Sequence, residues 1–253
     1  MTICIPVFNE SLTIVGYLRE LETEFGNQNA RVVIVDDCST DETVLRIQEA
    51  NFGEFVRILR NARNRGHGPS VVSGLLCAMH SDFEVVVTVD GDGDISATEI
   101  RKLLMKLENE GADLVEARRR ERSDPAFRKL VSLGARCFIT VLGGSAMWSA
   151  KDANTPVRAY KRNVLGEILT HLNADWMTPN LVISMLARNL ELDIGYVDLD
   201  CRKVGGKSAQ GMTWRARFKN VPSQRFLLFC YSATLEMLRI GLSLRRQKAH
   251  KFR

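Results

Sequence analysis

The sequence lacks the features of a disulfide-stapled or membrane-spanning protein. Its six cysteines contain no CxxC pair, and most of them stand in apolar surroundings: Cys4, Cys38, Cys77, Cys137, Cys201 and Cys230. Scattered thiols of this kind are typical of buried, reduced cysteines, which favours a reducing compartment. No apolar run approaches the roughly 20 residues of a membrane span. The first strand pattern begins at Thr2 and leaves no room for a secretory signal, so we expect a cytoplasmic protein.

Acidic residues are almost absent from the C-terminal part of the chain. Residues 202–253 hold 13 Lys/Arg and one acidic residue, Glu236, whereas residues 1–201 carry a net charge of −7. An acidic body with a basic tail favours a polyanionic partner, either nucleic acid or an anionic membrane face. A nucleic-acid-binding protein should also show aromatic stacking platforms or a reader motif. Neither is present, so we expect no nucleic-acid partner.

The basic tail also carries an apolar stripe. Its members between residues 223 and 244 are Phe226, Leu227, Phe229, Cys230, Leu235, Leu238 and Leu242, interrupted by Arg225, Glu236 and Arg239. We therefore expect a main domain at residues 1–210 and a basic amphipathic segment at 211–253. Two interpretations of this segment remain open. It attaches peripherally to the cytoplasmic face of a membrane, or it is a terminal helix packed on the body with a solvated basic end.

The first hundred residues alternate between strand and helix patterns. Strands are predicted at residues 2–8, 31–36, 56–59 and 83–89, and later at 113–118 and 193–201. A helical stripe is formed by Leu12, Val15, Leu18, Leu21 and Phe25, and another helix is predicted near 70–80. Capping boxes at residues 39–42 and 96–99 are predicted to open two further helices. Repeated βα units of this kind predict an α/β fold with a parallel sheet covered on both faces.

Three aspartates at alternate positions, Asp90, Asp92 and Asp94, follow the strand at 83–89. Their spacing mimics the first ligands of an EF-hand calcium loop, but Ile95 stands where that loop needs glycine and Arg101 where it needs glutamate. The aspartates instead follow an interior strand, at the edge where ligands bind in open α/β sheets. A turn that caps the next helix is the alternative, but it does not explain three exposed carboxylates. The pattern predicts a divalent cation site.

Four motifs appear in a fixed order along the first half of the chain. They are IPVFNE (5–10), VDDCSTDET (35–43), the Asn/Gly-rich NARNRGHGPSVVSGLLCA (61–78) and VDGDGD (89–94). In this order they resemble the family 2 glycosyltransferases, over about the first 120 residues. The resemblance implies a GT-A fold, a Rossmann-like domain with a mostly parallel central sheet flanked by helices. It also implies a metal-dependent, inverting transfer of a sugar from a nucleotide-diphosphate sugar.

The resemblance gives roles to individual residues of the donor site. Asp90 and Asp92 match the DxD motif, which holds Mg²⁺ or Mn²⁺ on the diphosphate of the donor. Asp37 matches the aspartate that contacts the base or ribose. The other donor-binding positions are Pro6, Phe8, Glu10, Val35, Gly66 and Gly91. Core packing is an open alternative for Phe8, and a simple turn is an open alternative for Gly66.

The second half of the chain resembles the polyprenyl-phosphate sugar transferases, the group of dolichyl-phosphate mannosyltransferase. The matching segments are ADLVEARRR (112–120), FRKLVSLGAR (127–136), DANTPVRAYKR (152–162) and CRKVGGKSA (201–209). The resemblance implies a dolichyl- or undecaprenyl-type phosphate as acceptor. Its phosphate would be bound by Arg119, Arg128, Ser132, Arg202 and Lys207, since guanidinium donors match phosphate oxygens. A solvated charge run is the alternative for residues 118–120, and Lys203 is the alternative to Arg202.

The nature of the acceptor decides whether a general base is needed. A phosphate is an anion near neutral pH, so positioning and electrostatic stabilisation of the leaving diphosphate suffice. A saccharide or other hydroxyl acceptor needs a carboxylate base, and Asp152 is the candidate catalytic residue for that role. A structural hydrogen bond within its turn is the alternative function of Asp152. Either acceptor implies glycan or cell-envelope synthesis, and both remain open.

Overall fold

A computed structural model describes residues 1–119, 152–202, 231–232 and 234–243. Its strands are β1 (Thr2–Val7), β2 (Arg31–Asp36), β3 (Val56–Arg60), β4 (Val85–Thr88), β5 (Leu114–Arg119), β6 (Arg158–Lys161) and β7 (Ile194–Leu199). Its helices are α1 (Ile14–Phe25), α2 (Thr43–Ala50), α3 (His67–Ala78), α4 (Ala97–Glu110), α6 (Arg162–Leu169) and α7 (Pro179–Asn189). Short 3-10 helices occupy Gly26–Gln28 and Gly53–Phe55. Residues 231–232 and 234–243 are helical and are called the C-terminal helix here.

One mixed sheet runs through the molecule in the strand order β3-β2-β1-β4-β6-β5-β7. Strand β6 is antiparallel to β4 and β5, and the other neighbouring pairs are parallel. The prediction of a mostly parallel sheet is therefore confirmed, and all six predicted strands are present. Strand β6 was not predicted from the sequence, because its four residues, which end in Lys161, are too few to show an apolar pattern. The strand nevertheless joins the two parallel parts of the sheet.

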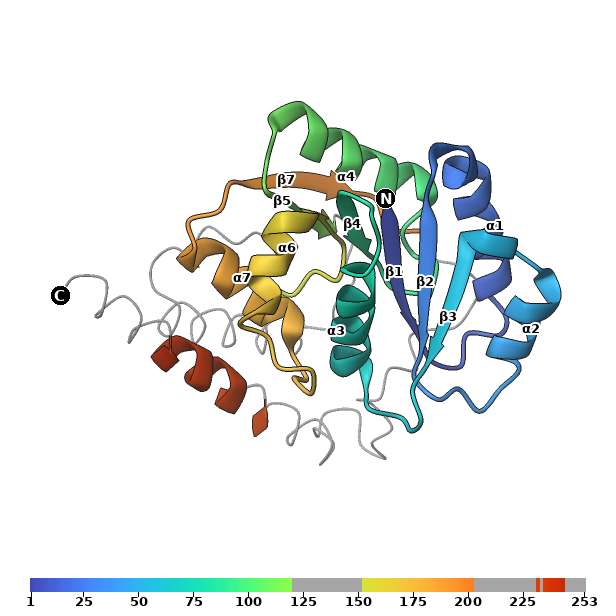
Figure 1. Cartoon of the computed structure of the whole chain (residues 1–253), viewed down its shortest axis with the longest axis horizontal. Helices are drawn as coiled ribbons and strands as arrows, with labels where there is room; N and C mark the ends of the chain where they lie inside the picture. Colours follow the sequence, from blue (N-terminus) through green and yellow to red (C-terminus); the bar gives the residue numbers. More distant parts are fainter. Residues whose placement is uncertain (120–151, 203–230, 233, 244–253) are drawn as a thin grey trace.

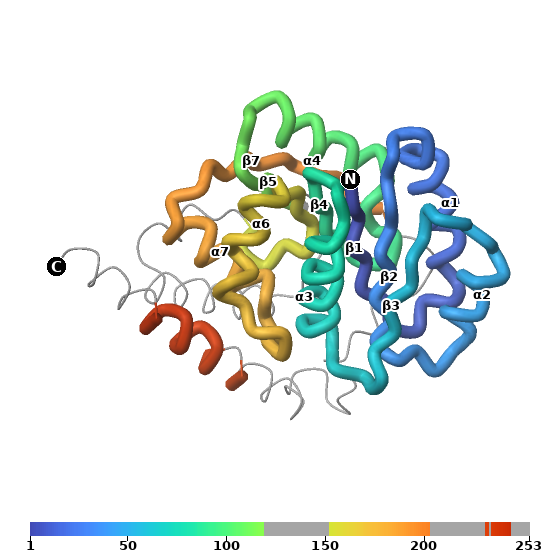
Figure 2. Tube along the Cα trace, viewed as in Figure 1, coloured from blue at the N-terminus to red at the C-terminus, as the bar shows by residue number. Residues whose placement is uncertain are grey.

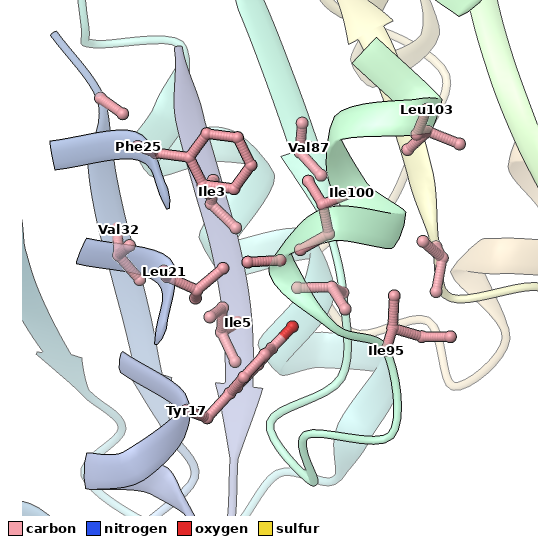
Figure 3. Packing of buried hydrophobic residues seen from close by; sticks show 14 of the residues in the cluster. Ile3, Ile5, Tyr17, Leu21, Phe25, Val32, Val87, Ile95, Ile100 and Leu103 are labelled. Carbon is pink, nitrogen blue, oxygen red and sulfur yellow. The ribbon is translucent and has the colours of Figure 1, made fainter. Parts of the chain in front are cut away.

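Helices cover both faces of the sheet, with α1, α2 and α4 on one face and α3, α6 and α7 on the other (Figure 1). Alternate side chains of β1 point to opposite faces of the sheet. Ile3 and Ile5 pack in the hydrophobic cluster under α1, α2 and α4, called the first cluster, and Cys4 packs in the second cluster, under α3, α6 and α7. Figure 3 shows the first cluster, where Phe25 and Leu21 meet Ile3 and Ile5. Helix α3 returns from the edge strand β3 across β2 and β1 (Figure 2).

Local predictions near two helix starts are partly wrong. Leu12 does not belong to the buried stripe of α1 and is 67% exposed, because the helix begins only at Ile14. Ser96 caps α4 as predicted, accepting a hydrogen bond from the Glu99 N–H at 3.3 Å. The Glu99 carboxylate, however, accepts from the backbone N–H of Asp200. The capping box at 39–42 is wrong, since its first residue accepts from the backbone of residue 9 and α2 has no side-chain cap.

The C-terminal helix packs against the body. Met237 and Ile240 are 2% and 4% exposed and join the cluster that contains α7, whereas Arg239 and Leu242 face outward. Figure 1 shows this helix in red beside α7. The predicted domain boundary at 210/211 lies outside the described residues. In the part of the chain that the structure describes, no helix combines the length and apolarity needed to cross a membrane, and the four described cysteines form no disulfide.

Candidate active site

The carboxyl ends of β1, β2 and β4 lie side by side and open into a cleft. Strand β1 pairs with both β2 and β4, so the segments that follow these strands meet at one edge of the sheet. The cleft has a volume of about 210 Å³ and is lined by Pro6, Val7, Phe8, Glu10, Asp37, Asn64, His67, Ser70, Asp90, Gly91 and Asp92. Seven of these are predicted donor-site or metal-site residues. The structure therefore brings most of the predicted donor site together.

Residues 90–94 follow β4 and are called the aspartate loop here. Gly91 allows this loop to lie directly on β1. A Cβ at this position would stand 2.6 Å from Val7 Cγ1 and 3.1 Å from the Pro6 carbonyl oxygen, so no larger residue fits without displacement. The loop then turns at Gly93, whose φ is +75°. Asp90 and Asp92 consequently stand on either side of a glycine that is pressed against the end of the neighbouring strand.

Within the described residues, the carboxylates of Asp90 and Asp92 form no ion pair with a lysine or arginine, and Asp92 Oδ1 accepts a hydrogen bond from the Asp94 N–H at 3.0 Å. Asp90 Oδ1 is buried without a hydrogen-bond partner, and His67 Nε2 lies 3.6 Å from it. Desolvation by surrounding protein atoms, followed by the negative charge of Asp90, raises the pKa of Asp92 to about 7. Asp92 is exposed as a whole residue, which moderates the desolvation, but the repulsion acts in the same direction. The loop is arranged to receive positive charge.

Asp37 supports the wall of the cleft. Its carboxylate accepts hydrogen bonds from Asn61 Nδ2 at 2.9 Å, the Arg65 N–H at 2.8 Å and the Gly66 N–H at 2.7 Å. Gly66 has a φ of +95°, which a side chain would disfavour, so the turn interpretation of this glycine holds. Asp37 thus organises residues 61–66, whatever else it contacts.

Two further predicted donor residues have contrasting positions. Val35 is fully buried in the core and does not line the cleft. Phe8 is 43% exposed and lines the cleft, so the core-packing alternative for this residue is wrong. Sequence analysis missed Asn64, His67 and Ser70, although all three stand in the Asn/Gly-rich segment that it singled out. The four-motif pattern was the signal that could have found them.

The predicted acceptor-binding residues are described only in part. Arg128, Ser132 and Lys207 lie outside the described residues, as does the side chain of Arg119. Arg202 lies against the aspartate loop, where Nε donates to the Gly93 carbonyl at 2.8 Å and the guanidinium pairs with Glu20. Its role in binding an acceptor stays a prediction.

Two other residues of the predicted acceptor side have specific local contacts. Arg118 is exposed and forms an ion pair with Asp198 at 2.6 Å, which agrees with the solvated-charge interpretation for this residue. Asp152 begins the loop that leads into β6, and its carbonyl accepts from the Thr155 N–H at 3.1 Å. That turn agrees with the structural alternative for Asp152 but leaves its carboxylate chemistry untested.

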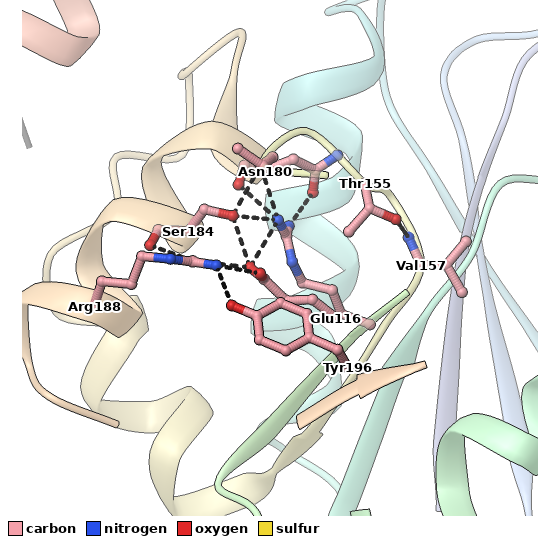
Figure 4. A network of polar contacts seen from close by, with 9 residues as sticks. Glu116, Thr155, Val157, Asn180, Ser184, Arg188 and Tyr196 are labelled. Carbon is pink, nitrogen blue, oxygen red and sulfur yellow. Dashed lines mark hydrogen bonds and ion pairs between the residues drawn. The ribbon is translucent and has the colours of Figure 1, made fainter. Parts of the chain in front are cut away.

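A buried polar network behind this loop escaped sequence analysis. Glu116 of β5 accepts from Ser184 Oγ at 2.7 Å and from Arg188 Nη2 at 2.7 Å, and it lies 3.4 Å from Arg158 (Figure 4). Burial alone would raise the pKa of Glu116, but the charge of Arg158 and the hydrogen bond from Arg188 outweigh it, and the pKa is lowered. Arg158 Nη2 also donates to the Ala153 carbonyl at 3.1 Å, and Ser184 Oγ lies 2.8 Å from the same oxygen, so this network holds the loop that contains residues 152 and 153.

Residues 2–169 match the family model described as glycosyl transferase family 2. The chain belongs to this family. Its mostly parallel, seven-stranded sheet with helices on both faces is a GT-A fold. The family resemblance inferred from four sequence motifs is thereby confirmed.

Curated relatives of this family 2 glycosyltransferase include two bacterial enzymes. The undecaprenyl-phosphate 4-deoxy-4-formamido-L-arabinose transferase of Proteus mirabilis (strain HI4320) is 28% identical over 208 residues, which cover 78% of this chain and 60% of the relative. The enzyme of the same name from Aeromonas hydrophila subsp. hydrophila is 28% identical over 217 residues, 84% of this chain and 63% of the relative. The chain thus spans less than two thirds of the length of these curated relatives.

Solved structures support the fold. The glucosyl-3-phosphoglycerate synthase from Mycobacterium tuberculosis in complex with phosphoglyceric acid has a TM-score of 0.60 and 20% identity, covering 82% of this chain and 72% of that chain. The same enzyme in complex with Mg²⁺ and uridine diphosphate has a TM-score of 0.60 and 19% identity, with the same coverage. At this level of identity the likeness establishes the GT-A architecture alone.

The aspartate loop of this family 2 glycosyltransferase fits a divalent cation that is shared with a ligand. Asp90 offers a buried oxygen without a hydrogen-bond partner, and Asp92 offers a second carboxylate, whose pKa is raised by desolvation and by the charge of Asp90. Hard carboxylate oxygens suit Mg²⁺ and Mn²⁺. Within the described residues, no three His, Cys, Asp or Glu side chains form a complete cage. A cation here would complete its coordination with oxygens of a bound phosphate ligand or water.

Proposed function

We propose that this glycosyltransferase transfers a sugar from a nucleotide-diphosphate sugar to a polyprenyl phosphate, with Mg²⁺ or Mn²⁺ and with inversion at the anomeric carbon. The observation that carries the proposal is the buried Asp90 oxygen without a hydrogen-bond partner beside Asp92, at the strand edge where GT-A clefts open. The curated relatives, which are named undecaprenyl-phosphate sugar transferases, support the acceptor class. The resemblance of residues 152–162 to the polyprenyl-phosphate transferases agrees with it.

The cleft residues divide into two groups. Asp90 and Asp92 would hold the cation, which when bound neutralises the charge that develops on the departing diphosphate. The nucleoside would lie along Pro6, Phe8, Glu10 and the wall that Asp37 supports. An aromatic face such as that of Phe8 suits a nucleobase, because base and ring gain by stacking. Gly91 keeps the aspartate loop close to this wall.

The transfer itself is a single displacement. An oxygen of the acceptor phosphate forms a bond to the anomeric carbon from the face opposite the leaving group, and the bond from that carbon to the diphosphate oxygen breaks. The acceptor oxygen is already anionic, so no proton has to be removed. The protein's contribution is alignment of the two phosphates and stabilisation of the leaving charge. Arg119, Arg128, Ser132, Arg202 and Lys207 remain the predicted contacts of the acceptor phosphate, and Asp152 needs no catalytic part in this reaction.

A polyprenyl phosphate is presented at a membrane, so we propose peripheral attachment through the basic C-terminal segment. The outward positions of Arg239 and Leu242 on the C-terminal helix agree with such a contact. Sedimentation with anionic liposomes, comparing the full chain with a variant in which the Lys/Arg residues after 244 are neutralised, tests this idea. Equal sedimentation of both would remove it.

The reaction is tested with a panel of radiolabelled nucleotide sugars, each offered with undecaprenyl phosphate and Mn²⁺ and then extracted into organic solvent. We expect label from one donor to enter the organic phase with the wild type and not with Asp92→Asn. The matched control is Asp94→Asn, which alters an aspartate of the same loop that does not line the cleft. Label that stays aqueous, but enters an added saccharide, would replace the lipid acceptor with a hydroxyl acceptor.

A further inference from the structure

Glu236, the lone acidic residue of the basic C-terminal region, is 7% exposed. Its carboxylate lies at the start of α7. Oε1 accepts from the Met177 N–H at 2.7 Å, and Oε2 accepts from the Thr178 N–H at 3.0 Å and from Thr178 Oγ1 at 2.7 Å. The described residues form no ion pair with it. Three hydrogen bonds thus satisfy the buried carboxylate, and the N-terminus of α7 adds a favourable dipole.

Glu236 binds the two residues that immediately precede the first turn of α7. The N-cap residue, Thr178, makes no side-chain capping bond within its own helix, and its N–H and hydroxyl both donate to Glu236, 58 positions further along the chain. The backbone of Met177 is bound in the same way. The C-terminal helix is therefore joined to the start of α7 by hydrogen bonds as well as by the packing of Met237 and Ile240.

The segment 174–178, which Glu236 holds, lies directly behind residues 65–68. Residues 61–68 form one wall of the donor cleft and are called the donor wall here. A Cβ on Gly68 would lie 2.5 Å from the carbonyl oxygens of both Trp176 and Met177, so the two backbones are in tight contact. Beside this contact, Arg65 Nη2 donates to Asp175 Oδ1 at 2.8 Å and to the Ala174 carbonyl at 3.1 Å. Residues 174–177 therefore press on the segment 65–68.

On the side away from residues 174–177, the segment 65–68 borders the donor cleft. The backbone N–H groups of Arg65 and Gly66 donate to Asp37, and His67 lines the cleft 3.6 Å from Asp90. A continuous series of contacts consequently runs from the C-terminal helix through residues 175–178 to the donor cleft. The steps from Glu236 to Asp37 are hydrogen bonds or a backbone contact too close to allow a Cβ, and the last step is the 3.6 Å approach of His67 to Asp90.

We propose that Glu236 is a positioning residue for the donor cleft, so that the C-terminal helix is a structural part of donor binding and not only a tail. The inference rests on the proposed use of a nucleotide-diphosphate donor. Loss of the carboxylate leaves the backbone N–H groups of the half-buried Met177 and the buried Thr178 without an acceptor, and it releases residues 176–178 from their position behind Gly68. The donor wall then loses its support, while the acceptor side is affected only indirectly.

The test compares three variants of the full chain, each checked by circular dichroism to be folded at the assay temperature. Glu236→Ala should weaken binding of UDP or GDP, measured by calorimetry with Mn²⁺, about tenfold, the equivalent of one or two hydrogen bonds. The donor KM should rise in parallel, with the polyprenyl phosphate KM nearly unchanged. Glu236→Gln, which keeps one acceptor oxygen, should lie between Glu236→Ala and the wild type.

Ile240→Ala is the matched control, because it removes buried packing from the same helix and leaves in place the Glu236 carboxylate that binds residues 177 and 178. It should lower the unfolding temperature and leave nucleotide affinity within about twofold of the wild type. An equal loss of affinity in Ile240→Ala and Glu236→Ala would overturn the inference, as would wild-type affinity in both Glu236 variants. A wild type that binds neither nucleotide would overturn the proposed function itself, and the inference with it.

Discussion

Carboxylates in two neighbouring parts of the same sheet have opposite surroundings. After β4, Asp90 has a buried oxygen without a hydrogen-bond partner, and the pKa of Asp92 is raised to about 7. In β5, Glu116 is more deeply buried, at 1% exposed, yet its pKa is lowered. The difference lies in the partners, because Glu116 has two guanidinium groups beside it and the aspartates mainly have each other. The first region is prepared for positive charge that arrives with a ligand, and the second already contains its own.

This contrast indicates that the aspartate loop is a binding site, whereas the Glu116 network is a structural joint, meaning a set of contacts that connects β5, β6 and α7. Burying a charge is costly unless the protein or a ligand compensates it. Arg158 and Arg188 compensate Glu116 at all times, and together they join β5 and β6 to α7. Under the proposed function, the charge of the aspartate loop is compensated only when the cation and the donor bind. Removing a partner should therefore damage folding in one region and catalysis in the other.

The largest effect is expected from Glu116→Ala. This change leaves the guanidinium groups of Arg158 and Arg188 buried without their common anion, which should lower the free energy of unfolding by about 3–5 kcal/mol. Urea unfolding measures the difference. Glu108→Ala, an exposed change on α4, is the control and should stay within about 0.5 kcal/mol of the wild type. A loss below about 1 kcal/mol for Glu116→Ala would mean that the network is not a structural joint.

A smaller energetic effect, but a larger functional one, is expected from Asp92→Asn. The change removes a proposed cation ligand, and transfer should fall about 100-fold or more, which is about 2.7 kcal/mol in the activation barrier. Because it also removes repulsion with Asp90, the free energy of unfolding should stay the same or rise slightly. Initial rates and urea unfolding of the same preparation test both statements. Retention of most of the activity would contradict the assignment of the metal site.

The smallest expected effect is a pair of opposite pH dependences in metal-free protein. The folded pKa of Glu116 lies below its ordinary value of 4.5, so its stabilising contribution is present above that pH and is lost as the pH falls further. The folded pKa of Asp92 is raised from 3.8 to about 7, so its contribution is present at low pH and is lost as the pH rises through that interval. Unfolding measured from pH 3 to 8 should show the second slope disappearing in Asp92→Asn. An unchanged slope would place its origin elsewhere.

Much of the donor half of the molecule could be predicted from the sequence. Its strands are continuous β-branched runs, and side chains that end such runs meet at one edge of a parallel sheet for reasons of geometry alone. Asp90 and Asp92 were found in this way. The capping box at residues 39–42 failed because Ser39 binds the Asn9 N–H across the cleft edge, a contact that no local pattern contains.

The later half was predicted less well, since its organisation depends on distant polar contacts. Strand β6 has only four residues, too few for an apolar pattern to identify it. It is recognisable as a strand only through its pairing with β4 and β5 in the folded sheet. Arg158 looked like one basic residue in a motif, but it is fully buried beside a glutamate 42 positions earlier in the chain. Sequence spacing carries no information about such a pair.

By itself the sequence determined the alternation of strands and helices, the family and the position of the paired aspartates, because the hydrophobic period of each segment and the order of motifs along the chain can be read without any tertiary contact. Only the tertiary structure decided which charges have partners. It gave Glu116 two arginines, left a buried Asp90 oxygen without a hydrogen-bond partner, and placed Glu236 of a basic tail at the start of α7. These outcomes depend on packing between distant segments, where a displacement of a few ångströms decides between a hydrogen bond and none.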